Sequence, residues 1–103
     1  MLVPKSLEEL AVPIESGKTI LFFTADWCGD YVYIKHAMPE IEAAFPEYTF
    51  VQVDRDDFIA VCQQWDVFGI PSFIAIEDGH EVGRFVSKNR KTKEEIMTFI
   101  SEL

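Results

Sequence analysis

One cysteine stands where a nucleophilic thiol could work, in the segment Thr24–Lys35, which reads TADWCGDYVYIK. Cys28 follows an apolar run and directly precedes a helical pattern, so we expect it at the N-terminus of a helix. Unpaired backbone N–H groups and the helix macrodipole favour an anion there, and the thiolate is the form of cysteine that attacks a disulfide. The carboxylates of Asp26 and Asp30 oppose this second negative charge. These residues predict an accessible and partly activated thiol at Cys28.

A hydrolytic role for Cys28 would need a histidine base within hydrogen-bond reach. His36 lies further along the predicted helix, about 12 Å away at a rise of about 1.5 Å per residue, and His80 falls in a turn. We therefore set aside a cysteine-protease type of site. The second cysteine, Cys62, lies on an apolar helical face, which is typical of a small core residue. No cysteine or histidine pattern indicates a disulfide framework or a metal site, and we expect no cofactor.

Length and composition predict one compact domain over residues 1–103, because 49% of the residues are hydrophobic and can form a core without disulfide or metal support. Eighteen acidic residues against nine basic ones give a net charge of −9, which argues against nucleic-acid binding. The one basic run, Lys88–Lys91, is interpreted as a solvated turn. The N-terminal residues lack a signal pattern and no apolar run is of membrane length, so we expect a cytoplasmic protein without membrane contact. We also expect it to be a monomer.

The predicted elements follow the order α, β, α, β, α, β, β, α. Capping boxes at Ser6–Glu9 and Thr92–Glu95 begin the first and last helices, and the first helix should stop near Pro13. A long helix is expected from Gly29 to Phe45, kinked at Pro39 because proline removes a backbone donor. Strands are predicted over 18–24, 48–54, 72–77 and 81–87, with a helix over 57–65 and a turn at Asp78-Gly79. This order implies a mixed sheet with helices on both faces.

The element order and three sequence features resemble the thioredoxin family. Trp27-Cys28-Gly29-Asp30 is similar to the family's redox motif, Gly69-Ile70-Pro71-Ser72 to its loop with a cis-proline opposite the active cysteine, and Asp78-Gly79 lies in the hairpin that follows. The resemblance covers nearly the whole chain. It implies an α/β thioredoxin fold, with a central mixed sheet of four or five strands flanked by helices on both faces. It also implies that Cys28 is the catalytic nucleophile and that substrate is bound by Trp27, Gly29, Asp30, Tyr31, Ile70 and Pro71.

Two positions depart from the family pattern. Tyr31 stands in place of the second, resolving cysteine, and Phe22 replaces the buried carboxylate that the family often carries on the central strand. Without a second thiol, Cys28 should form mixed disulfides that an external thiol resolves, so full dithiol turnover is not expected. Tyrosine is far larger than cysteine, so its ring should be displaced toward the edge of the active-site surface, or its neighbours should have moved.

Three interpretations remain open at this point. The first is a single-cysteine exchange protein that acts on protein disulfides or small thiols, with a thioredoxin-reductase-type donor among its partners. The second is a non-enzymatic module that binds peptide segments by the same face. The third is an ordinary dithiol reductase whose resolving cysteine is replaced by Tyr31 in this chain.

Overall fold

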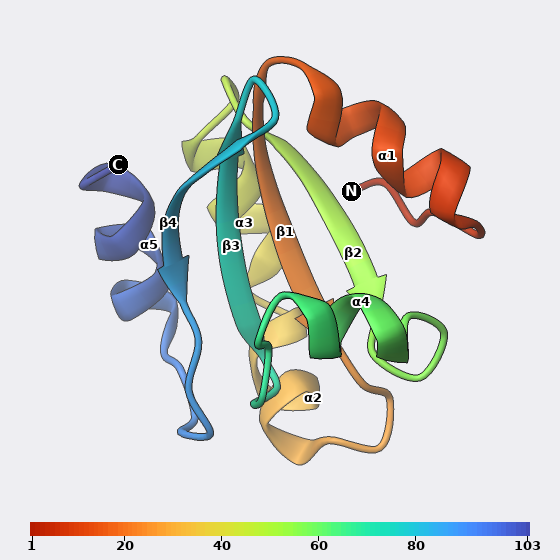
Figure 1. The fold of residues 1–103 in the computed structure, drawn as a ribbon. Coiled ribbons are helices and arrows are strands. Elements are labelled where there is room, and N and C mark those ends of the chain that lie inside the picture. The colour runs from red at the N-terminus through yellow and green to blue at the C-terminus, as the bar shows by residue number, and fades with distance from the viewer.

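A four-stranded sheet forms the centre of the computed structural model, which describes residues 1–103 (Figure 1). The strand order is β2-β1-β3-β4, where β1 is Lys18–Thr24, β2 is Thr49–Asp54, β3 is Ser72–Glu77 and β4 is His80–Phe85. β1 runs parallel to β2 and antiparallel to β3, and β3 runs antiparallel to β4. The two central strands are buried almost throughout, as strands covered on both faces must be. The sheet is therefore mixed, as the sequence predicted.

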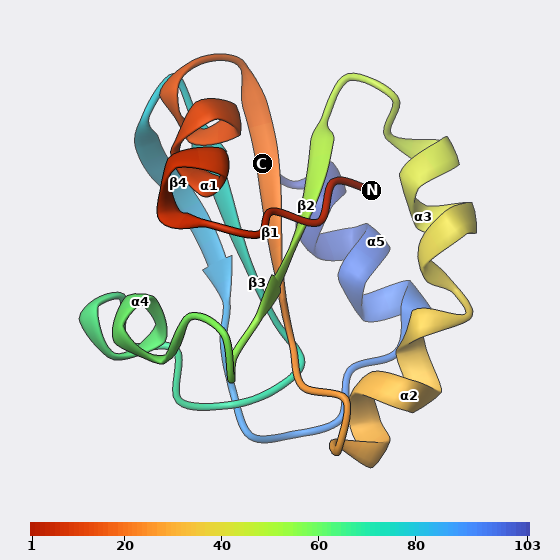
Figure 2. The same cartoon turned by 90° about the vertical axis from the view of Figure 1, so that its right-hand side faces the viewer.

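Helices cover both faces of this sheet (Figure 2). α1 (Leu7–Glu15) and α4 (Ile59–Gln64) lie on one face, and α2 (Gly29–Lys35), α3 (Met38–Ala44) and α5 (Lys93–Ser101) lie on the other. The capping side chains predicted at Ser6 and Thr92 begin α1 and α5. None of these helices has the length and apolar character needed to cross a membrane.

The helix predicted from Gly29 to Phe45 is two helices, so that prediction was wrong. α2 ends at Lys35, Ala37 is the N-cap of α3, and Pro39 lies in the first turn of α3. Backbone N–H groups in a first turn have no partner within the helix, so proline loses nothing there and begins a new helix instead of kinking an old one.

Pro13 does not stop the first helix, because α1 continues through it to Glu15. The carbonyl that the missing N–H of Pro13 would have bonded belongs to Glu9, an exposed residue, and it can bond to water instead. The Pro13 carbonyl accepts a hydrogen bond from the Thr19 hydroxyl at 2.6 Å. That bond ties the end of α1 to the start of β1.

The core lies between the sheet and its helices, with aromatic rings on the face of β1 and β3 that α2 covers. Phe22 stacks on Phe73 with ring centroids 4.9 Å apart and planes within 7°. Ile34, Met38 and Ile41 of α2 and α3 are buried in this part of the core. This packing holds α2 at the carboxyl end of β1, where the site lies.

Candidate functional site

Cys28 lies where the chain leaves the carboxyl end of β1 and turns into α2. Its N–H donates to the Ala25 carbonyl at 2.9 Å, and its own carbonyl accepts the first helical bond, from Val32 N–H at 3.1 Å. Cys28 is the N-cap of α2, and its thiol is free and half-buried. The structure therefore places the thiol beside the unpaired N–H groups of a helix N-terminus, as the sequence predicted.

The loop that precedes β3 lies against this thiol. The Ile70–Pro71 peptide bond is cis, and the Cys28 Sγ donates to the Ile70 carbonyl oxygen at 3.5 Å. The antiparallel register pairs Phe23 with Ser72, so the start of β3 lies next to the end of β1. The Ser72 hydroxyl donates to the Gly69 carbonyl and closes the loop on itself. Sheet pairing thus brings together two motifs that are more than 40 residues apart in the sequence.

A groove of about 240 Å³ runs beside Cys28 and is lined by Trp27, Cys28, Arg55, Phe68, Gly69, Ile70 and Lys88. Trp27 and Phe68 form its apolar rim, because 65% and 63% of their surfaces are exposed. Two large apolar side chains at the surface beside a thiol suit the binding of an extended segment.

Arg55 and Asp56 hold the Trp27 ring, and sequence reasoning missed both of them. The Trp27 Nε1 donates to the Asp56 carboxylate at 3.0 Å, and the Arg55 guanidinium lies 6.0 Å from the indole centroid. These residues follow β2, whereas Trp27 follows β1. The carboxyl ends of parallel strands meet at one edge of a sheet, so the charged run after β2 was the signal that could have revealed them.

Tyr31 is buried, with 6% of its surface exposed, so the predicted displacement of its ring toward the surface does not occur. The ring packs against Phe22 at a centroid distance of 5.8 Å and a tilt of 49°. The Lys35 ammonium lies 5.8 Å from the Tyr31 ring centroid. Because Phe22 also stacks on Phe73, three aromatic rings fill the space beneath α2.

Burial is the main cause that raises the pKa of Tyr31. The carboxylates of Asp26 and Asp54 raise this pKa further, and the Gln52 side chain lowers it. The phenol is therefore neutral at neutral pH and is not a nucleophile there. Tyr31 therefore occupies the position of the resolving cysteine but cannot act as the nucleophile that resolves a mixed disulfide.

The second cysteine, Cys62, is buried in α4 with 3% of its surface exposed, and it forms no disulfide. Burial is the main cause that raises the pKa of its thiol, which Asp54 raises further and Arg55 lowers. A buried thiol with a raised pKa carries little thiolate and reacts slowly. The prediction of Cys62 as a core residue agrees with this placement.

The basic run at 88–91 is more than a solvated turn, and for Lys91 that interpretation was wrong. Arg90 donates from Nε to Asp30, in the first turn of α2, at 2.8 Å. The Arg90 guanidinium also lies 4.4 Å from the Tyr33 ring centroid. Lys91 is buried with 1% of its surface exposed.

Gly29, the remaining predicted site residue, begins α2 beside open space, so nothing in its surroundings requires a glycine.

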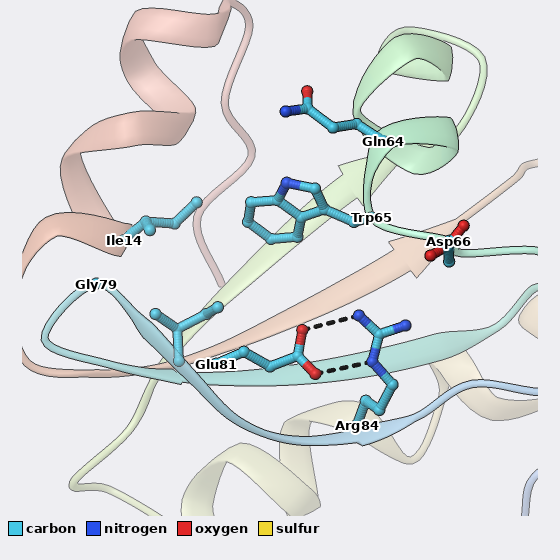
Figure 3. Close-up of a pocket in the computed structure, with 8 residues that line it drawn as sticks. Ile14, Gln64, Trp65, Asp66, Gly79, Glu81 and Arg84 are labelled. Carbon is cyan, nitrogen blue, oxygen red and sulfur yellow. Dashed lines mark hydrogen bonds and ion pairs between the residues drawn. The ribbon is translucent and has the colours of Figure 1, made fainter.

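A separate cavity of about 310 Å³ lies between the ends of α1 and α4 and the β3–β4 hairpin (Figure 3). The Glu81 carboxylate accepts two hydrogen bonds there from the Arg84 guanidinium, each at 2.8 Å. The Trp65 indole lies on the opposite side of this cavity from that ion pair. The cavity shares no residue with the groove beside Cys28 and contains no thiol.

Comparison with known sequences assigns this chain to a family. The family model described as Thioredoxin matches residues 4–102. A thioredoxin H-type from Picea mariana is 41% identical over 68 residues, which cover 66% of this chain and 54% of that protein. The thioredoxin of Chlamydia trachomatis serovar D is 33% identical over 97 residues, which cover 94% of this chain and 93% of that protein. The matches to several plant relatives span between 54% and 66% of those proteins' own length.

Solved structures agree with the sequence matches. Thioredoxin from Trypanosoma brucei brucei superimposes with a TM-score of 0.87 over 99% of this chain and 88% of that one, at 24% identity. Fasciola hepatica thioredoxin superimposes with a TM-score of 0.79 over 95% of this chain and 97% of that one, at 30% identity. The fold is therefore the thioredoxin fold. From the family match, the relatives and the shared fold together, we conclude that this chain belongs to the thioredoxin family.

Proposed function

We propose that this chain is a single-cysteine thiol–disulfide exchange protein in which Cys28 is the nucleophile. One observation carries the proposal: the Cys28 thiol sits at the N-terminus of α2, 3.5 Å from the Ile70 carbonyl and beside an open groove. Three residues further on, where a resolving thiol would act, the buried ring of Tyr31 fills the position. The site therefore supports the first half of a dithiol cycle and lacks the group for the second half.

The exchange proceeds in two nucleophilic substitution steps at sulfur. The Cys28 thiolate attacks one sulfur of a substrate disulfide, a new S–S bond forms to Cys28, and the other substrate sulfur leaves as a thiolate with the bonding pair. An external thiolate then attacks the substrate sulfur of the mixed disulfide, forms a new S–S bond to it, and Cys28 leaves as a thiolate. The backbone around Ile70 and Pro71 pairs with the substrate segment, and Trp27 and Phe68 contact its apolar side chains.

The partners that fit this chemistry are protein disulfides and small thiols, with a thioredoxin-reductase-type donor or a small thiol as the reductant. Such exchange suits the reducing cytoplasm, where free cysteines persist. A second candidate function is a peptide-binding module that uses the same groove without redox chemistry. The exposed rim of Trp27 and Phe68 favours it, because such a rim can hold a segment whether or not the thiol reacts.

Incubation with glutathione disulfide should convert the folded chain to a product that carries one glutathione, attached to Cys28. Cys62 should stay unmodified, because it is buried and its pKa is raised by that burial. Intact-mass measurement followed by peptide mapping gives the number and place of the adducts.

Two controls accompany this measurement. Cys28→Ser should gain no adduct while folded, and unfolding the chain in denaturant should expose Cys62 to reaction. A folded wild-type chain that gains no adduct would favour the binding module. Rapid formation of an internal bond between Cys28 and Cys62 would show that Cys62 is not locked in the core.

A further inference from the structure

Lys91 is the only buried basic residue of the chain. Its ammonium donates to the carbonyl oxygens of Ser87 at 3.1 Å and Asn89 at 2.9 Å, and it lies 5.4 Å from the Phe85 ring centroid. Burying an ammonium is costly unless hydrogen bonds and charges compensate it. The two carbonyl groups that accept from Lys91 supply this compensation. These two bonds hold residues 87–91, which we call the basic loop, in a closed turn.

The Ser87 carbonyl that Lys91 holds lies against the backbone of Gly69. A Cβ added at Gly69 would lie 2.0 Å from the Ser87 oxygen and 2.5 Å from its carbonyl carbon. Only glycine allows two backbone segments to approach so closely. Gly69 immediately precedes Ile70, whose carbonyl accepts from the Cys28 thiol. The basic loop therefore packs against the Gly69–Pro71 segment on the side away from the Cys28 thiol.

The same loop is tied to the helix that carries Cys28. The segment between β4 and α5 passes below the sheet toward α2 (Figure 2), and Arg90 of this segment bonds Asp30 at 2.8 Å. Burial is the main cause that lowers the pKa of Lys91, whereas electrostatic interactions with Asp30, Glu95 and Cys28 raise it. The Lys91 ammonium therefore lies in the electrostatic field of α2 and the start of α5, while its hydrogen bonds go to the basic loop itself.

We propose that Lys91 is a positioning residue for exchange with polypeptide disulfides. It holds the Ser87 carbonyl against Gly69 and so fixes the Ile70–Pro71 backbone at the place where an extended substrate segment pairs beside Cys28. This inference rests on the proposed exchange function and adds to it a residue that distinguishes polypeptide disulfides from small ones. Small disulfides need only the thiol, whereas a peptide also needs the correctly placed backbone, so only exchange with a peptide depends on Lys91.

Two probes with the same leaving group separate these requirements. One is a short peptide whose central cysteine carries a nitrothiobenzoate disulfide, and the other is the symmetric nitrothiobenzoate disulfide without peptide. In each reaction Cys28 forms a new S–S bond and one nitrothiobenzoate thiolate leaves. The absorbance of that thiolate gives the rate constant for each probe. The ratio of the two rate constants isolates the contribution of backbone pairing.

Lys91→Met keeps an unbranched apolar side chain of similar length and removes the donors. We expect it to slow the peptide probe by roughly 10-fold and the small probe by less than about 2-fold, because misplacement by about 1 Å can cost about 10²-fold in a positioned reaction. Lys93→Met is the matched control, since Lys93 lies two residues on and pairs with Glu40 across the surface. It should leave both rates unchanged.

The outcomes separate this inference from the function on which it rests. Equal slowing of both probes by Lys91→Met, or no slowing of either, would overturn the positioning role. If Lys91→Met does not give a folded circular-dichroism spectrum, Gly69→Ala decides the matter, because it opens the same contact from the other side. It must then slow the peptide probe selectively, and equal effects on both probes would overturn the proposal. A wild-type chain that reacts with neither probe would contradict the exchange function itself.

Discussion

Replacing Tyr31 with cysteine is expected to raise the rate of insulin-disulfide reduction, with dithiothreitol as donor, by at least about 10²-fold over the wild-type chain. Residues three apart on a helix lie on the same face, so the new thiol can attack the mixed disulfide on Cys28 directly. Well-oriented groups act at effective concentrations of about 10⁵ M or more. The wild-type chain depends on an external thiol, so its mixed disulfides should be long-lived. The measurement is the onset of insulin precipitation at equal protein concentrations.

Tyr31→Ser is the matched control, because it also removes the ring but adds no thiol, and it should remain as inactive as the wild type. Despite this increase, the rate of Tyr31→Cys should stay below that of a dithiol site with a buried carboxylate, since Phe22 cannot help to deprotonate the second thiol. Equal activity of Tyr31→Cys and the wild type would mean that the chemistry does not depend on position 31. An inactive Tyr31→Cys with a native circular-dichroism spectrum would favour the peptide-binding module.

Phe22→Ala is expected to lower the free energy of unfolding by about 3–5 kcal/mol, the usual range for removing a buried ring. Phe22 has 1% of its surface exposed on the central strand β1. Its ring contacts both Phe73 at 4.9 Å and Tyr31 at 5.8 Å between centroids. Its loss would leave a cavity that a strand paired on both sides cannot close by moving. Urea denaturation followed by circular dichroism measures the change.

Phe68→Ala is the control for Phe22→Ala, because 63% of Phe68 is exposed on the rim of the groove and its removal should change the unfolding free energy by less than about 0.5 kcal/mol. A loss of less than about 1 kcal/mol for Phe22→Ala would show that the three rings do not form the support beneath α2. In that case the explanation given for the buried position of Tyr31 would fail as well.

The sequence alone was enough for many features that depend on neighbouring residues, although it missed the break between α2 and α3 and the continuation of α1 through Pro13. Capping residues determined where α1 and α5 begin, and continuous or alternating apolar runs determined the strands of the sheet. The place of Cys28 at the start of a helix also followed from local pattern. Hydrogen-bonding and burial preferences of this kind act over a few residues, so they can be read without knowing the fold. The pairing of the Cys28 turn with the Ile70 loop followed only from the family resemblance.

Tertiary structure decided the features that depend on residues far apart in the chain. The Trp27 ring is held by Asp56, Tyr31 is buried because Phe22 and Phe73 stack beside it, and Lys91 is buried because the basic loop closes behind Gly69. A lysine in a charged run is normally solvated, and a tyrosine in place of a cysteine is normally too large. The closed basic loop provides the hydrogen bonds that compensate the burial of Lys91, and contacts between distant segments provide the space that accommodates the ring of Tyr31. The local sequence pattern does not contain this information.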